Sequence, residues 1–226
     1  MLTYDDLLSR ARSLTRPGRR AILGIAGAPG SGKTTLAERL VRDLNGTGEP
    51  WVAHVPMDGF HLADAELDRL GRRDRKGAPD TFDAAGYAAL LRRLREEADG
   101  DDVVYAPGFE RVLEQPVAGA VPVPPGARLV VTEGNYLLLD TGAWARVRPE
   151  LDAVWFCETD EAERVRRLVA RHEEFGKSHE EAVAWVEGPD RRNAGLVAAT
   201  RDRADLVVRG LPGGAGPGRA GARSVG

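Results

Sequence analysis

A glycine-rich segment holds the residues best suited to chemistry. It reads Gly27-Ala28-Pro29-Gly30-Ser31-Gly32-Lys33-Thr34 and fits the Walker A pattern G-x-x-x-x-G-K-[ST]. Glycines let backbone N–H groups converge on phosphate oxygens, and a helix starting near Lys33 directs the positive end of its dipole at the same anion. Lys33 would reach the β- and γ-phosphates, and the Thr34 hydroxyl would bind Mg²⁺. We therefore expect a nucleoside triphosphate, ATP, with Mg²⁺ on this loop, whose contacts extend to Thr35.

An acidic residue follows the second predicted strand. Residues 51–55 form the second predicted strand, and Asp58 comes three residues later in Met57-Asp58-Gly59-Phe60-His61. Ligands of parallel sheets bind at the carboxyl ends of the strands, so Asp58 is expected to face the γ-phosphate. A carboxylate there can accept a hydroxyl proton or orient the attacking oxygen. The alternative interpretation is an ordinary Asp-Gly turn.

A second carboxylate follows the third predicted strand, in Thr132-Glu133-Gly134-Asn135. At that strand end Glu133 can hold Mg²⁺ through water or position the nucleophile. The alternative is a solvated glutamate at the end of a strand.

Three arginines share one face of a predicted helix. Arg164, Arg167 and Arg171 have the spacing i, i+3, i+7, beside an apolar stripe. Such a row can clamp transferring phosphate oxygens when a lid closes, which would give these arginines a catalytic role. A solvated arginine-rich face is the alternative.

Hydrophobic periodicity indicates the elements that position these residues. It predicts helices over residues 3–14, 33–44, 84–98, 161–173, 178–187 and 191–200, and strands over 21–26, 51–55, 128–132, 151–156 and 204–208. Residues 60–82 and 103–126 show no clear period. Alternating strands and helices predict an α/β fold, a mainly parallel sheet with helices on both faces. With the phosphate loop this indicates a three-layer P-loop NTPase fold with a helical lid. We expect one domain over residues 1–210 and a flexible Gly/Pro/Arg tail over 211–226.

Composition excludes several classes of protein. Of 226 residues, 42% are hydrophobic, and 32 Lys+Arg against 35 Asp+Glu leave a net charge of −3, which favours a globular core and disfavours a nucleic-acid partner. The lone Cys157 allows neither an internal disulfide nor a cysteine metal cluster. No segment approaches the ~18 apolar residues that span a bilayer. The N-terminus also lacks the apolar region of a signal peptide. We expect no membrane partner and a cytoplasmic location.

Further motifs resemble those of the P-loop small-molecule kinases, the group that includes uridine kinase, phosphoribulokinase and bacterial-type pantothenate kinase. The motifs are GAPGSGKT, MDGFH at 57–61, KGAPDTFD at 76–83, PGFER at 107–111, TEGNYLLLD at 132–140, RLVARHEEFGKS at 167–178 and a run from Asn193. The resemblance spans about residues 20 to 209. It is strongest to short bacterial proteins of the nucleoside/nucleotide kinase-like or fructose-transport-kinase-like kind. It implies a kinase that moves the γ-phosphoryl group of ATP to a hydroxyl of a small molecule.

The resemblance also implies roles for single residues. Asp58 matches the general base of the group, Glu133 its metal- or water-positioning carboxylate, and Arg167 and Arg171 its lid arginines. Residues expected at the acceptor pocket are Phe60, His61, Lys76, Asp80, Arg111, Tyr136 and Asn193. The chain is shorter than typical pantothenate kinases, and PGFER replaces their Pro-Tyr-Ser-His type of run. The acceptor therefore stays open among a nucleoside, a pantothenate-like acid and a sugar.

Two other functions fit the sequence less well. A GTPase-type switch would carry an Asn-Lys-x-Asp run that reads guanine, and the sequence has none. A nucleotide-binding regulator without kinase activity is disfavoured because Lys33, Asp58 and Glu133 are intact. The expected partner is a small hydroxyl compound, and a homodimer is left open.

Overall fold

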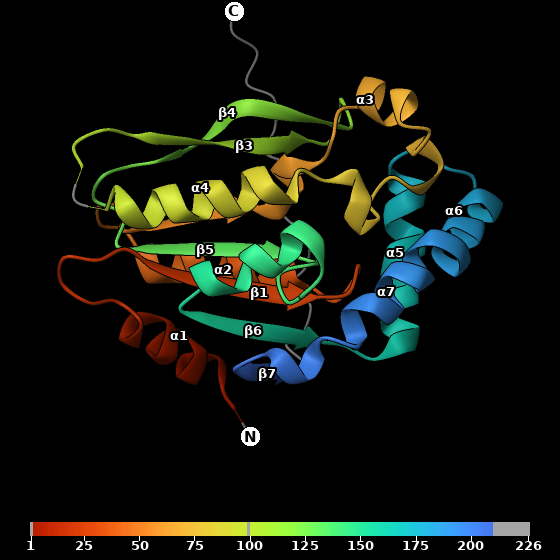
Figure 1. Cartoon of the computed structure of the whole chain (residues 1–226). Coiled ribbons are helices and arrows are strands. Elements are labelled where there is room, and N and C mark those ends of the chain that lie inside the picture. Colours follow the sequence, from red (N-terminus) through yellow and green to blue (C-terminus); the bar gives the residue numbers. More distant parts are fainter. Residues whose placement is uncertain (1, 99, 210–226) are drawn as a thin grey trace, which may run out of the picture.

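A five-stranded parallel sheet forms the centre of the molecule (Figure 1). The computed structural model describes residues 2–98 and 100–209. The strands follow the spatial order β2-β5-β1-β6-β7, and every pairing between neighbours is parallel. Their bounds are β1 Ala21–Gly27, β2 Val52–Pro56, β5 Leu129–Gly134, β6 Ala153–Glu158 and β7 Leu206–Arg209. The predicted α/β fold with a mainly parallel sheet is confirmed.

Helices cover both faces of this sheet, which explains why β1 is buried along its whole length. The α-helices are α1 Tyr4–Ser13, α2 Lys33–Asn45, α3 Asp64–Arg69, α4 Ala84–Glu96, α5 Glu161–Glu174, α6 His179–Trp185 and α7 Arg191–Ala198. Leucines of α1 and α2 pack against Leu23 and Ile25 on one face. Tyr87 and the leucines of α4 pack against Ile22 on the other.

Local sequence signals fix several helix starts. The Thr3 hydroxyl accepts a hydrogen bond from the Asp6 N–H, and the Asp6 carboxylate accepts one from the Thr3 N–H, which is a capping box. Ser178 and Glu181 make the same reciprocal pair at α6, as their spacing predicts. Satisfying these N–H groups explains why the predicted and observed starts agree within about one residue.

A two-stranded antiparallel hairpin is the main element that hydrophobic periodicity missed. Strands β3 Val104–Glu110 and β4 Gln115–Val123 pair within the segment 103–126. Most of β4 is exposed, and prolines interrupt its polarity pattern, so no period-2 signal arises. The hairpin packs on the 3₁₀ turn Met57–Phe60, where a Cβ on Gly59 would lie 2.2 Å from the Pro107 carbonyl oxygen. Gly59 therefore permits the hairpin to approach.

Helices α5, α6 and α7 lie together at one end of the sheet, as Figure 1 shows, and form the expected helical lid. The predicted tail at 211–226 lies outside the described residues, and the single domain over 1–210 stays a prediction. Within residues 2–98 and 100–209, no helix combines the length and apolar composition needed to cross a membrane.

Candidate active site

The phosphate loop joins β1 to α2 in a tightly packed turn. Gly30 and Gly32 have φ values of 80° and 88°, a left-handed conformation that favours glycine. A Cβ on Gly27 would lie 2.5 Å from the Ser31 hydroxyl oxygen. That buried oxygen has no hydrogen-bond partner among the described residues. Lys33 is also buried at the start of α2. A cradle of glycines with an unsatisfied buried hydroxyl and a buried lysine fits a bound phosphate chain.

The two carboxylates reach this loop because of the strand order. Strand β5 lies between β1 and β2, and Glu133 is in register with Ile25 on one side and Pro56 on the other. Asp58 follows Pro56 within the next turn. The carboxyl ends of these three strands lie side by side, so Lys33, Asp58 and Glu133, which follow or end them, come together there.

Glu133 is only 3% exposed. Burial raises the pKa of Glu133 to about 7, and the charge of Asp58 adds to this, while Lys33 and the Thr34 hydroxyl act in the opposite direction. No group of three or more His, Cys, Asp or Glu side chains forms a metal site in the described part of the chain. Mg²⁺ usually takes one or two protein oxygens and completes its shell with phosphates and water. The Thr34 hydroxyl with the Glu133 carboxylate fits that pattern.

Asp58 is an ionised carboxylate at the centre of the site. Its side chain is 30% exposed, and Oδ2 lies 3.6 Å from Nη2 of Arg111 on the hairpin. Burial alone would raise the pKa of Asp58. The charge of His61 when its ring is protonated, together with the charges of Lys33, Arg111 and Arg171, outweighs burial and keeps the pKa of Asp58 below the ordinary value. An ionised carboxylate can accept a hydrogen bond from a substrate hydroxyl.

Aromatic side chains form a wall beside Asp58. The His61 ring packs between Phe82 and Phe109, with ring centroids 4.0 and 4.8 Å away. Its Nδ1 lies 2.8 Å from the Asp58 carbonyl oxygen. Burial lowers the pKa of His61, which favours the neutral ring. The Phe60 ring packs on the Tyr87 ring, with their centroids 5.1 Å apart. His61 and Phe60 thus shape the wall and brace the turn that carries Asp58.

Three of the residues expected at the acceptor pocket hold a loop in place. The Tyr136 hydroxyl and the Asn193 amide donate to the Gly77 carbonyl oxygen at 2.5 and 3.3 Å. Lys76 donates to the Asp64 carboxylate at 2.7 Å and to the Glu114 carbonyl at 2.5 Å. The polar groups of these residues are engaged within the protein, and their contact with substrate stays a prediction.

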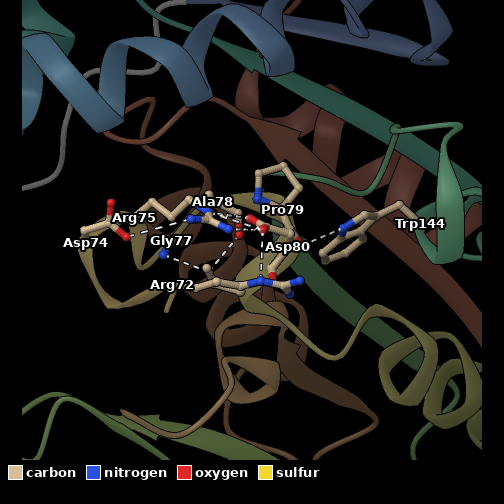
Figure 2. Close-up of polar contacts among 9 residues, drawn as sticks. Arg72, Asp74, Arg75, Gly77, Ala78, Pro79, Asp80 and Trp144 are labelled. Atoms are coloured by element: carbon tan, nitrogen blue, oxygen red, sulfur yellow. Dashed lines mark hydrogen bonds and ion pairs between the residues drawn. The ribbon is translucent and has the colours of Figure 1, made fainter. Parts of the chain in front are cut away.

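Asp80 is engaged with arginines of the preceding turn (Figure 2). Its carboxylate lies 2.9 Å from Arg75 and 3.4 Å from Arg72, and the Trp144 indole donates to the neighbouring Pro79 carbonyl at 3.0 Å. The Asp80 carboxylate is 46% exposed. These contacts rigidify the 76–83 motif, and the acceptor role of Asp80 stays a prediction.

The arginines of α5 differ in what they contact. Arg164 is buried and donates to the Pro29 carbonyl of the phosphate loop at 3.1 Å. The Arg167 Nη1 atom would lie 3.4 Å from a Cβ on Gly32, so this guanidinium borders the same loop. Arg171 lies one turn further on, close enough to lower the pKa of Asp58. Spacing indicated the shared face, but it did not reveal that Arg164 anchors the loop.

A parallel sheet with a phosphate loop, two carboxylates at adjacent strand ends and an arginine-bearing helical lid defines a P-loop kinase. The model of the Phosphoribulokinase / Uridine kinase family matches residues 22–214, and the chain belongs to this family. The family resemblance seen in the motifs is confirmed, and the protein is a kinase of the small-molecule type.

Individual relatives carry the names of different kinases. The chain is 33% identical to a "putative uridine kinase" of Schizosaccharomyces pombe, over 92% of this chain and 91% of that protein. It is 30% identical to a "pantothenate kinase" of Leifsonia xyli, over 92% and 70%. The chain is also similar to a "putative fructose transport system kinase" from Silicibacter, whose crystal structure superposes with a TM-score of 0.82. The two sequences are 37% identical, and the match covers 92% of this chain and 100% of that one. These names do not agree on an acceptor.

Proposed function

We propose that this kinase transfers the γ-phosphoryl group of ATP to a hydroxyl group of a small molecule, with Asp58 as the group that accepts the hydroxyl proton. The observation that carries the proposal is the position of β5 between β1 and β2, because it brings Asp58 and Glu133 to the phosphate loop. A carboxylate beside a phosphate cradle can orient an incoming oxygen for in-line attack.

The proposed reaction forms one bond and breaks one. The acceptor oxygen bonds to the γ-phosphorus, the bond from that phosphorus to the bridging oxygen breaks, and ADP leaves. The hydroxyl proton passes to Asp58, whose depressed pKa suits an orienting acceptor more than a strong base. Lys33 and Arg167 are proposed to neutralise charge on the transferring group, since positioning and electrostatics supply most of the rate in such reactions.

Thr34 and Glu133 are the residues proposed to hold Mg²⁺. When bound, the ion would neutralise charge on the β- and γ-phosphate oxygens. Because burial raises the pKa of Glu133 to about 7, a cation beside it would favour its ionised form. This pairing supports a metal role for Glu133.

The acceptor is proposed to bind between the hairpin and the lid, near Phe60, His61 and Arg111. A coupled ADP-release screen over nucleosides, pantothenate, pentoses, hexoses and other small alcohols tests the function. We expect acceptor-dependent ADP release, with the phosphorylated product detected by mass spectrometry. ATP binding with no acceptor-dependent release from any compound would instead indicate a nucleotide-binding regulator.

A further inference from the structure

Arg171 carries a positive charge that the structure leaves without a counter-ion. It is half-buried on α5, and its side chain makes no hydrogen bond or ion pair with any residue in 2–98 or 100–209. Arg164, Arg166 and Arg167 on the same helix each pair with Glu161 or Glu163 at 2.6 to 2.7 Å. Burial, and then the charge of Arg111, lower the pKa of Arg171. Two guanidinium groups close together and partly withdrawn from water repel each other, and an anion between them would offset this cost.

Arg111 approaches the same region from the hairpin. Its only ion pair with the described residues is the 3.6 Å contact between its Nη2 and the Asp58 carboxylate, longer than a hydrogen bond. Its guanidinium carbon lies 5.8 Å from the ring centre of Phe109 and 5.9 Å from that of Phe175 at the end of α5. Arg111 therefore bridges the hairpin and the lid over Asp58, with its donors largely unused.

The nucleotide side of the site already has its own cations. Lys33 lies in the phosphate loop, and Arg167 borders Gly32. The remaining lysine near the hairpin, Lys76, is paired with Asp64 at 2.7 Å. The acidic groups that act on Arg171 are Asp190, Asp58 and Glu114. The Asp190 carboxylate also lies 2.8 Å from His172. The two arginines thus add positive charge beside Asp58, from the hairpin and from α5.

We propose that the acceptor is a small hydroxylated anion, a hydroxy acid or a sugar phosphate, whose carboxylate or phosphate binds Arg111 and Arg171 while its hydroxyl meets Asp58. This inference rests on the proposed kinase function and names its substrate class. The anionic oxygen would lie about 2.8 Å from Arg111, and the reacting hydroxyl about 2.8 Å from Asp58. Because Arg111 and Asp58 are 3.6 Å apart, the anionic oxygen and the hydroxyl are then within about 9 Å of each other. Guanidinium groups bind carboxylate and phosphate in two-pronged fashion, which would fix the distance to the hydroxyl.

The test compares acceptors that differ only in their anionic group. With the full chain, saturating ATP and Mg²⁺, ADP release is measured for glycerate against glycerol, pantothenate against pantothenol, ribose 5-phosphate against ribose, and fructose 1-phosphate against fructose, with uridine as a neutral nucleoside. We expect kcat/KM for at least one anionic compound to exceed that of its neutral partner about 100-fold, in line with two charge-assisted contacts. Whether the acids or the phosphates are preferred identifies the anion.

Variants separate the acceptor from the nucleotide. Arg111→Gln and Arg171→Gln are each expected to raise the KM of the preferred anionic acceptor about 10-fold while the KM of ATP changes less than about 2-fold. Arg166→Gln, on the same helix with a 75% exposed side chain, is the matched control and should change neither. Arg111 is 45% exposed, so its replacement should leave folding intact.

Three outcomes would overturn the inference. A neutral compound or uridine preferred over every anion would overturn the substrate class and leave the kinase function standing. A rise in the KM of ATP alone would assign both arginines to the nucleotide. No acceptor-dependent release from any compound would remove the proposed function, and the inference with it.

Discussion

The Arg164 guanidinium on α5 donates a hydrogen bond of 3.1 Å to the carbonyl oxygen of Pro29 in the phosphate loop. The side chain is buried, and two of its nitrogens also bind the Glu161 carboxylate at 2.7 Å. This contact ties the first turn of the lid to the nucleotide cradle. The first turn of α5 is therefore anchored to the phosphate loop, and Arg167 and Arg171 lie further along the same helix.

Replacing Arg164 should lower the stability of the protein. For Arg164→Gln we expect the free energy of unfolding to fall by about 1–3 kcal/mol, because the Pro29 carbonyl loses its donor in a buried place. Urea denaturation measures the change. Arg166→Gln should stay within about 0.5 kcal/mol of the wild type, since its side chain is exposed. Equal losses in the two variants would contradict a special role for the Pro29 contact.

Asp58→Asn should separate binding from transfer. The amide keeps the shape of the side chain but removes the charge that accepts the hydroxyl proton, so kcat is expected to fall about 10²- to 10⁴-fold. ATP affinity, measured by calorimetry, should stay close to that of the wild type. Transfer at a near wild-type rate would exclude Asp58 from the mechanism.

Lys33→Ala should weaken both ATP binding and phosphoryl transfer. Loss of a charge-assisted contact to the phosphates is expected to reduce ATP affinity about 10- to 100-fold and to lower turnover as well. Calorimetry of ATP binding, compared with Asp58→Asn, distinguishes the two effects. An unchanged affinity would count against the phosphate-loop assignment.

Gly59 tests the contact between the hairpin and the turn that carries Asp58. In Gly59→Ala the new Cβ would lie 2.2 Å from the Pro107 carbonyl oxygen, so β3 or the turn must move. We expect a loss of about 1–3 kcal/mol in unfolding free energy, together with reduced transfer. Gly126→Ala is the matched control, because a Cβ there meets no atom within 4 Å. Identical behaviour of both variants would show that the hairpin adjusts freely.

His54 should make the protein sensitive to mild acid. Burial lowers the pKa of His54 to about 4, and its Nε2 is buried without a hydrogen-bond partner in the described residues. The folded pKa lies below the ordinary value of 6.5, so this contribution to stability is present above pH 6.5 and is lost as pH falls toward 4. Between pH 7 and pH 5 the loss amounts to about 2 kcal/mol.

Denaturation at several pH values measures this effect. The acid-dependent loss should shrink in His54→Leu, which cannot gain a proton at this position. The control His179→Leu alters a 73% exposed side chain and should keep the wild-type pH profile. If His54→Leu and the wild type lose stability in parallel between pH 7 and pH 5, His54 is not the acid-sensitive group.

Local patterns were sufficient to predict most of the fold. A continuous apolar run gave β1, a capping box gave the start of α6, and the glycine pattern gave the phosphate loop. Asp58 and Glu133 were singled out because each follows an apolar strand. These signals work from sequence because each depends on neighbours within a few residues, through N–H capping, side-chain period or backbone conformation.

Tertiary structure decided which charges are free and which are neutralised. Tyr136 and Asn193 converge on one carbonyl, that of Gly77, from positions far apart in the chain. Lys76 is neutralised by Asp64, whereas the Arg171 side chain has no hydrogen-bond or ion-pair partner among the described residues. Such outcomes depend on the sheet order and on how the hairpin and lid pack against it. Long-range packing sets these distances, and the spacing of residues along the chain does not predict them.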